Sequence, residues 1–261
     1  MRFSESSRVG LTGLLALIAT YALGRQAFGL FMPRFRADFG LSLDVLGFYA
    51  SAAQAGFLAE TVATGVLTAR FGPRVPVVAG CLLLTFGAAT IASAASPLVL
   101  AVGVIVAGTS AGGAWAPFSD AIAYKVPTEE TRRALSLVNA GSPVGLVVAS
   151  ALVLVAGDEW RTVWWGFAAI GLVAAVSAWR VLAPGVVGQP SGHKRPQLGW
   201  FLNPRSLRML VVGFIVDPSL FGVLSARLGS DAALLITAMP ALLVASVPPA
   251  PENRLKPLKA R

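Results

Sequence analysis

The chain has 261 residues, of which 56% are hydrophobic and 13% are charged, and its formal net charge is +9. Soluble domains have about one charged residue in four, so this composition excludes an ordinary soluble domain and indicates an integral membrane protein. The positive charge does not indicate a nucleic-acid partner, because no cluster of base-contacting residues accompanies a soluble core. The expected surroundings are a lipid bilayer.

The first apolar stretch follows Arg2 and Arg8, as it would in a signal peptide. It continues past Arg25 to Met32, however, and no small-residue cleavage site precedes a soluble domain. We therefore expect a membrane span here rather than a cleaved leader.

A membrane-spanning helix needs about 20 mainly apolar residues, because each residue adds about 1.5 Å across a core of about 30 Å. Six such stretches follow one another, near residues 11–33, 46–68, 75–94, 98–119, 134–156 and 162–182. Two weaker candidates come later: 209–226, which contains Asp217 and Pro218, and 232–248, which is short and holds Pro240. The expected fold class is all-α, a polytopic membrane helix bundle.

The loops between these stretches carry unequal numbers of Lys and Arg. If the N-terminus lies in the cytoplasm, the inner segments up to Arg208 hold twelve basic residues and the outer loops hold three. Basic loop residues favour the cytoplasmic side, so we expect a cytoplasmic N-terminus. Trp160, Trp164 and Trp165 lie at the outer end of the sixth stretch, where we expect an aromatic belt at the membrane interface.

The composition changes after the sixth stretch. Residues 1–182 form the expected six-span bundle. Residues 183–207 are rich in Pro, Gly and basic residues and predict a cytoplasmic linker. Residues 208–248 hold the one or two weaker spans of an incomplete second half, and residues 249–261 are a polar, Pro-rich, basic tail.

A short basic turn separates the second and third stretches. Gly72 permits a tight reversal of the chain, and Pro73 suits the first turn of the helix that follows. Arg70 and Arg74 can anchor the turn to anionic headgroups on the inner side of the membrane. This topology anchor is the simplest interpretation of the two arginines.

The same turn resembles a motif of the major facilitator superfamily of secondary transporters. The family pattern is G-x-L-[small]-D-[RK]-x-G-x-[RK], and residues 65–74 read GVLTARFGPR. Ala69 stands where the family has aspartate. The matching positions are Gly65, Leu67, Arg70, Gly72 and Arg74.

Three further segments support this resemblance. Residues 24–42, 107–127 and 134–154 are similar to the first, fourth and fifth helices of bacterial members, and most of all to the YbfB/YjiJ-like permeases. The resemblance covers residues 10–183 and fades after residue 208.

The resemblance implies twelve helices in two six-helix halves, each made of two inverted three-helix repeats, with substrate bound between the halves near the midplane. It also implies a cytoplasmic gate. In this gate Arg74 pairs with Asp120 at the inner end of the fourth helix, and Ala69 leaves Arg70 less restrained. Simple solvation of these charges is the alternative.

Two charges stand out inside the predicted spans, where an ionisable group is costly unless it is paired or hydrated. Arg25 lies about 21 Å and Glu60 about 12 Å from the inner surface at about 1.5 Å per residue. Arg25 could bind an anionic group or balance an acid in a pathway, or it could form a structural pair. Glu60 could couple transport to protons, because a buried carboxyl can titrate near neutral pH, or it could form an interhelical hydrogen bond.

Asn139 shares one face of the fifth stretch with Ser136 and Ser142, at three-residue steps. These side chains could bind a substrate, or they could hold helices together, as polar residues in membrane helices commonly do. Trp115 could line the same cavity or pack between helices.

Residues suited to other chemistry are scarce. Cys81 is the only cysteine and His193 the only histidine, and the phosphate-binding pattern GxxxxGK[ST] does not occur. We expect no enzymatic activity, no ATPase, no metal site and no cofactor.

These features together predict a secondary active transporter that moves a small solute across the cytoplasmic membrane of a bacterium by alternating access, with proton coupling as one option. Only 53 residues follow Arg208, too few for six further spans. The alternative is therefore a truncated or frameshifted half-transporter, or an accessory membrane protein. A second copy or a partner half would then complete the cavity. The sequence does not distinguish a sugar, an amino acid, a drug or an organic anion as the substrate.

Overall fold

The computed structural model describes residues 5–156 and 158–185. The chain divides into two compact units, Met1–Phe201 and Leu202–Arg261, and all the described residues belong to the first. The weaker spans at 209–226 and 232–248, most of the expected linker and the basic tail lie outside the described residues. The domain boundaries beyond residue 185 therefore stay predictions.

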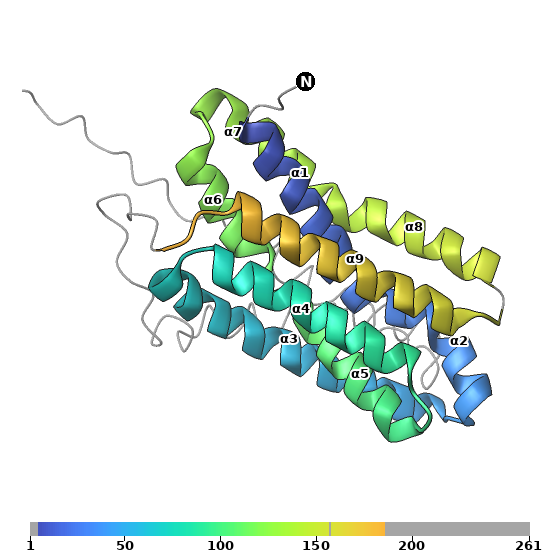
Figure 1. Cartoon of the computed structure of the whole chain (residues 1–261). Helices are drawn as coiled ribbons and strands as arrows, with labels where there is room; N and C mark the ends of the chain where they lie inside the picture. Colours follow the sequence, from blue (N-terminus) through green and yellow to red (C-terminus); the bar gives the residue numbers. More distant parts are fainter. Residues whose placement is uncertain (1–4, 157, 186–261) are drawn as a thin grey trace, which may run out of the picture. The chain divides into compact units, whose positions relative to one another are not determined.

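The described part of the chain is helical apart from short turns (Figure 1). Its elements in order are α1 (Glu5–Leu17), η1 (Ile18–Gln26), α2 (Ala27–Phe39), α3 (Leu43–Phe71), α4 (Arg74–Ala92), α5 (Pro97–Thr109), η2 (Ser110–Gly113), α6 (Trp115–Lys125), α7 (Thr128–Asn139), α8 (Gly141–Ala156) and α9 (Trp160–Val181). The π-helical segment η1 joins α1 to α2, and the 3₁₀ turn η2 leads from α5 to α6. The expected all-α class is confirmed.

The helices of the described residues make six passes through the bundle, and five of these are long and apolar enough to cross a bilayer. These five are Glu5–Phe39, Arg74–Ala92, Pro97–Lys125, Thr128–Ala156 and Trp160–Val181. The remaining pass, α3, is not among them, although its 29 residues exceed the length required. Of the six expected spans, the one at 46–68 is therefore the exception, because Gln54 and Glu60 interrupt the apolar sequence of α3.

Short polar caps and glycines set the ends of the passes. The Ser42 hydroxyl accepts a hydrogen bond from the Val45 backbone N–H and caps the start of α3, and Ser96 caps α5 in the same way. Gly40 ends α2 in the left-handed conformation, with φ of 62°. These caps keep the turns short, so successive passes run side by side in alternating directions.

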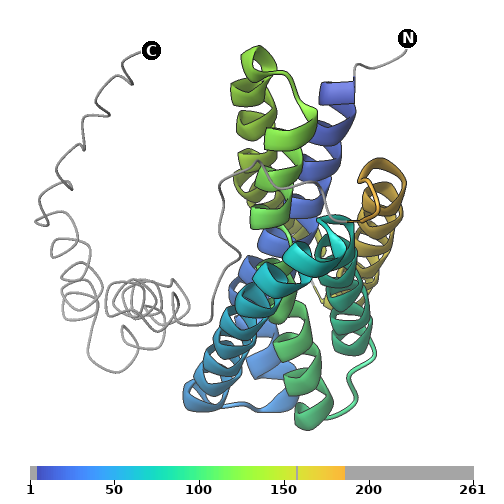
Figure 2. The same cartoon turned by 90° about the vertical axis from the view of Figure 1, so that its left-hand side faces the viewer.

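The turns gather at two ends of the bundle. The first end, called the basic end below, holds the start of α1, the α3–α4 and α6–α7 turns and the end of α9. Lys125 Nζ lies 3.7 Å from Glu5 Oε1 there, and Figure 2 shows the start of α1 (dark blue) beside α6 and α7 (green). The other end, called the clamp end, holds the α2–α3, α4–α5 and α8–α9 turns, and an ion pair joins Arg34 to Asp158.

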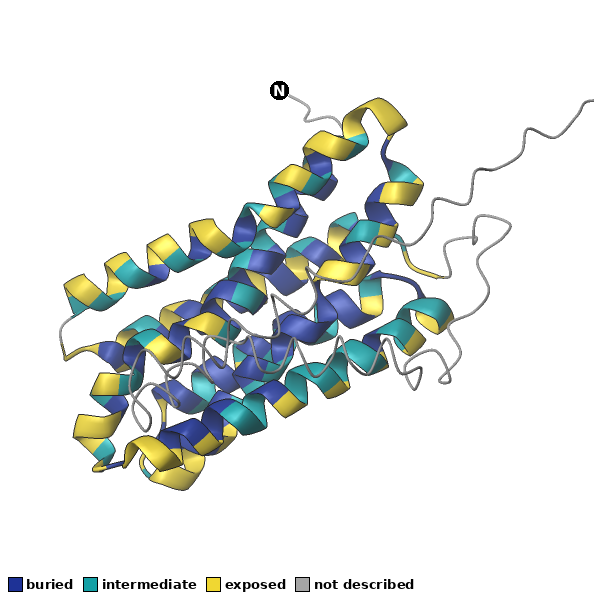
Figure 3. Ribbon diagram, turned by 180° about the vertical axis from the view of Figure 1, so that it is seen from behind, coloured by how far each residue is buried: buried dark blue, intermediate teal, exposed yellow. Residues whose placement is uncertain are grey.

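Close helix packing builds the core. α4 packs most extensively against α9 and α5, and a Cβ added at Gly87 would lie 2.7 Å from the Ala107 Cα. Buried residues line the faces that helices turn toward one another, and exposed residues line the outer faces (Figure 3). Val147, Leu154 and Val155 on α8 are among the most exposed apolar side chains, as expected for a face in contact with lipid.

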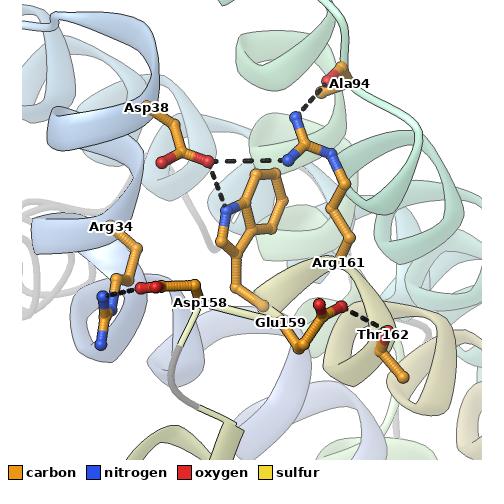
Figure 4. Close-up of polar contacts among 8 residues, drawn as sticks. Arg34, Asp38, Ala94, Asp158, Glu159, Arg161 and Thr162 are labelled. Carbon is orange, nitrogen blue, oxygen red and sulfur yellow. Dashed lines mark hydrogen bonds and ion pairs between the residues drawn. The ribbon is translucent and has the colours of Figure 1, made fainter.

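A cluster of polar contacts joins three segments of the chain at the clamp end (Figure 4). Asp38 Oδ2 accepts a hydrogen bond of 2.7 Å from the Trp160 Nε1–H and lies 3.6 Å from Arg161 Nη1. Arg161 also donates to the Ala94 carbonyl oxygen at 3.1 Å, and its guanidinium lies 4.2 Å from the Trp160 ring centroid. One carboxylate and one guanidinium thus join the end of α2, the α4–α5 turn and the start of α9.

The tryptophans at the start of α9 do not form the expected aromatic belt. Trp160 and Trp164 are buried against Phe31 and Phe35 of the first pass, with ring centroids 5.1 to 6.1 Å apart, and only Trp165 is exposed, at 53%. The belt prediction is corrected because residues 160 and 164 lie one turn apart on the inward face, whereas residue 165 points about 100° away from that face.

Candidate functional site

The first candidate residue, Arg25, lies in η1 and contacts α3. Its Nη2 donates a hydrogen bond of 2.7 Å to Gln54 Oε1, and its guanidinium carbon lies 4.1 Å from the centroid of the Phe57 ring. Gln54 is buried, so α3 supplies both a neutral acceptor and an aromatic face to a partly buried charge. The Arg25 guanidinium is thereby held in a fixed orientation part-way along the first pass.

Glu60 lies six residues beyond Gln54 on α3, against a group of glycines. A Cβ at Gly113 would lie 2.7 Å from Glu60 Oε1, one at Gly80 3.5 Å from the same oxygen, and one at Gly112 2.9 Å from the Glu60 Cβ. The backbone of Gly112 and Gly113 supplies hydrogen bonds to the carboxylate. The other oxygen, Oε2, is buried and has no hydrogen-bond partner among the described residues.

Tyr21 links the surroundings of the two charges. Its ring meets the Phe57 ring edge-on, with centroids 6.2 Å apart, and it interacts electrostatically with both Arg25 and Glu60. Tyr21 thus lies within electrostatic reach of both charges, with Gln54 and Phe57 beside Arg25.

Two breaks in helical geometry lie side by side at this level. Ser110, the first residue of η2, donates hydrogen bonds to the Ala107 carbonyl at 2.6 Å and to the Thr20 carbonyl of η1 at 3.4 Å. Interrupted helices in membrane proteins are tolerated where they line a binding site or cavity, because they leave backbone groups for other partners. The breaks therefore mark the same level that carries Arg25 and Glu60.

Asn139 is part of a third polar contact. Its Oδ1 accepts a hydrogen bond of 2.8 Å from Trp115 Nε1, which joins the end of α7 to the start of α6. The hydroxyl of Ser142, in the first turn of α8, donates a hydrogen bond of 3.3 Å to Gln26 Oε1 of η1. Asn139, Trp115 and Gln26 are all exposed, so this polar face is open on the described unit.

The motif turn between α3 and α4 contacts the end of the last pass. Arg74 Nε donates a hydrogen bond of 2.8 Å to the Leu182 carbonyl, and its guanidinium lies 4.8 Å from the Trp179 ring centroid. Gly72 has φ of 80°, and a Cβ there would collide with the Gly185 carbonyl oxygen. The turn therefore holds the end of α9 and the residues that follow it.

The other predicted gate residues lie on α3 and α6. Gly65 lies within α3, and exposed Arg70 has its guanidinium 5.3 Å from the neighbouring Phe71 ring. Asp120 is exposed on α6. The end of α9 offers Arg74 an unsatisfied carbonyl and an aromatic face. The Arg74–Asp120 gate stays a prediction.

Several participants were not singled out from the sequence. Gln54 and Gln26 are polar residues inside apolar stretches, and that signal was available. Gly112 and Gly113 did not by themselves indicate the 3₁₀ turn η2, and the sequence carries no proline or glycine pair at the centre of η1 to indicate its π-helical geometry.

Comparison with known proteins adds to this geometry. The sequence matches the profile of the Major Facilitator Superfamily over residues 14–249, which is most of the chain. The chain belongs to the Major Facilitator Superfamily. The described residues, with their long apolar passes, accordingly form part of a multi-pass integral membrane protein, and the superfamily consists of transporters rather than enzymes.

The sequence identity to individual proteins is low. A chloramphenicol resistance protein of Streptomyces lividans is 28% identical over 220 residues, which cover 79% of this chain and 55% of that protein. The chain thus spans about half the length of this curated relative.

Solved structures of two transporters have a similar fold. The xylose transporter XylE from E. coli, in an inward open conformation, gives a TM-score of 0.53 at 16% identity, covering 92% of this chain and 55% of that one. A D-xylose-proton symporter gives a TM-score of 0.56 at 14% identity, covering 92% and 66%. At identities this low, the similarity supports the fold alone and does not indicate which substrate this chain binds.

Proposed function

We propose that this chain forms the wall of a solute pathway in a secondary active transporter, which works by alternating access. The contact between Arg25 and Gln54 carries the proposal, because it places an oriented charge beside two helix breaks part-way through the bundle. An ionisable group at such depth is expensive and is expected to face a pathway or a partner rather than lipid.

In this proposal the three candidate residues have separate roles. Arg25 lines the pathway because Gln54 orients its charge beside the two helix breaks. Asn139 lines it because it bonds to Trp115 on an exposed face. Glu60 couples transport to protons, because one of its carboxylate oxygens is buried without a hydrogen-bond partner among the described residues. The resemblance to YbfB/YjiJ-like permeases belongs to the proposal as well.

The proposed location is the cytoplasmic membrane of a bacterium, with the N-terminus and the basic end in the cytoplasm. This orientation rests on the excess of Lys and Arg in the inner loops. Arg70 and Arg74 at the α3–α4 turn would then lie at the inner headgroups, where anionic lipids attract them.

The proposed partner is a second six-helix half, because in this superfamily the substrate lies between two halves. The described unit supplies six passes, and its polar face with Asn139 and Gln26 is exposed. A second copy of the chain or a separate half would enclose that face. A non-transporting accessory protein is the alternative, and no feature of the described residues favours it.

Reconstitution tests the proposal. The full chain is placed in proteoliposomes, and uptake of radiolabelled D-xylose and of chloramphenicol is measured with and without a pH gradient, against empty liposomes. We expect saturable uptake of a small solute that the gradient accelerates, and we expect Glu60→Gln to remove the acceleration. Uptake no faster than in empty liposomes, for these and a wider solute panel, would contradict the proposal.

A further inference from the structure

Two threonines of α3 bond differently from six other threonines of the described helices. In helices, threonine hydroxyls commonly donate to the carbonyl four residues earlier, or three residues earlier. Six do so here at four residues: Thr20, Thr61, Thr85, Thr90, Thr109 and Thr131. The hydroxyls of Thr64 and Thr68 are buried and have no hydrogen-bond partner among the described residues.

These two hydroxyls continue a line that begins at Glu60. Glu60, Thr64 and Thr68 follow one another at four-residue steps and so share one face of α3. The Glu60 Oε2 atom is likewise buried without a partner in the described part of the chain. A buried carboxylate or hydroxyl without a hydrogen bond is costly, so three such atoms in a row indicate a common partner that runs along the helix.

The spacing of the line fits water. Four residues of α-helix rise about 6 Å along the axis. One water that bridges two oxygens through hydrogen bonds of about 2.8 Å spans about 5.6 Å. One water between Glu60 and Thr64 and a second between Thr64 and Thr68 therefore match the steps of the helix. The line ends two residues before Arg70, at the basic end.

The titratable residues of α4, which packs against α3, are Arg74 at the basic end and Cys81. Cys81 on α4 and Tyr21 on η1 interact electrostatically with Glu60. α5 and η2 contain no titratable residue, and the titratable residues of α6 are Asp120, Tyr124 and Lys125. No lysine or arginine within α5 or η2 opposes the passage of a proton toward Glu60.

We propose that Thr64 and Thr68 hold a file of water molecules through which Glu60 exchanges its proton with the aqueous phase at the basic end. This inference rests on the proposed proton coupling at Glu60. Each threonine hydroxyl both accepts and donates a hydrogen bond and so relays a proton between neighbouring waters. One proton enters the file beside Thr68, one is delivered to Glu60 Oε2, and the waters and hydroxyls end unchanged.

Cysteine accessibility tests the water file directly. Thr64→Cys and Thr68→Cys are made singly in a Cys81→Ala background, reconstituted in liposomes and exposed to the hydrophilic reagent methanethiosulfonate ethylammonium. The matched control is Val66→Cys, which lies between them in depth and is 56% exposed on another face. We expect positions 64 and 68 to react on the order of tenfold faster, because the reactive thiolate forms in contact with water. Equal or slower reaction at position 64 would overturn the file.

Proton exchange provides a second measurement on minimally changed proteins. After a pH jump, infrared spectroscopy follows the protonated-carboxyl band, which Glu60→Gln assigns. We expect Thr64→Val to slow the change of this band about tenfold through the loss of one hydrogen-bonded link, and Thr64→Ser to restore it. Thr61→Val, whose hydroxyl is already bonded to its own helix, serves as the control and is expected to leave the rate unchanged.

The two measurements separate the inference from the function on which it rests. Unreactive cysteines at positions 64 and 68 contradict the water file even if Glu60 titrates. A Glu60 band that does not respond to pH removes proton coupling from the proposed function. An unchanged rate in a folded Thr64→Val protein contradicts the relay.

Discussion

The two ends of the bundle hold their charges differently. At the clamp end, Asp38 and Arg161 tie together three segments that are far apart in the sequence. At the basic end, Arg74 holds the end of α9 through one backbone carbonyl and the face of the Trp179 ring, and Arg70 is exposed. In alternating access each half moves largely as a rigid body. The comparison indicates a clamp end whose charges cross-link several segments and a basic end whose arginines have fewer partners.

The largest expected effect comes from removing Trp160, the buried residue at the centre of the clamp end. Trp160→Ala deletes a buried ring that packs on Phe35 and donates to Asp38, and we expect it to lower the free energy of unfolding by about 3–5 kcal/mol. Equilibrium unfolding in mixed micelles, followed by circular dichroism, measures the loss. The control is Trp165→Ala, and a loss as large for exposed Trp165 would contradict a clamp built by the buried ring.

A single substitution in the α3–α4 turn is expected to destabilise the basic end. Gly72→Ala places a Cβ at φ of 80° and ψ of 176°, and this Cβ also meets the Gly185 carbonyl. We expect a loss of about 1–3 kcal/mol in the free energy of unfolding from backbone strain. Gly166→Ala in α9 is the matched control, because nothing lies within 4 Å of the added Cβ, and the same unfolding assay should show a gain of up to about 1 kcal/mol there. Equal effects at the two glycines would argue against a strained turn.

A smaller change sharpens the account of the clamp. Asp38→Asn keeps an oxygen for the Trp160 N–H and loses the charge opposite Arg161, so we expect a loss of about 0.5–1 kcal/mol. The side chain of Asp38 is 42% exposed and that of Asp158 is 94% exposed, so Asp158→Asn should cost less in the same assay. High salt should reduce both losses. A larger loss of unfolding free energy for Asp158→Asn than for Asp38→Asn would show that the Arg34–Asp158 pair, and not the Asp38–Arg161 pair, is the main ionic contact of the clamp end.

The sequence predicted the fold of the described residues because the length and apolarity of its stretches are strong local signals. It did not predict which face of a helix is buried, as the tryptophans of α9 show. Lipid is as apolar as a protein core, so apolar residues alone do not separate a lipid-facing position from a packed one.

The candidate site was predicted in part for the same reason. A charge in an apolar stretch stands out, so the sequence singled out Arg25 and Glu60 as candidates. Gln54 reaches Arg25 from α3, and Gly113 reaches Glu60 from η2, so only the packing of the elements brings each pair together. Ala69 and the contact of Arg74 with Leu182 illustrate a related limit, because a motif names residues without naming their partners.

The central claim is that the oriented charge of η1 serves solute passage, and Arg25→Ala in the proteoliposome uptake assay tests it most directly. Arg36→Ala at the exposed clamp end is the control, and the amount of folded protein inserted is measured for both. The account predicts that Arg25→Ala abolishes uptake with normal insertion, whereas Arg36→Ala transports as the unmodified chain does. Undiminished uptake by Arg25→Ala, or loss of the inserted protein itself, would contradict it.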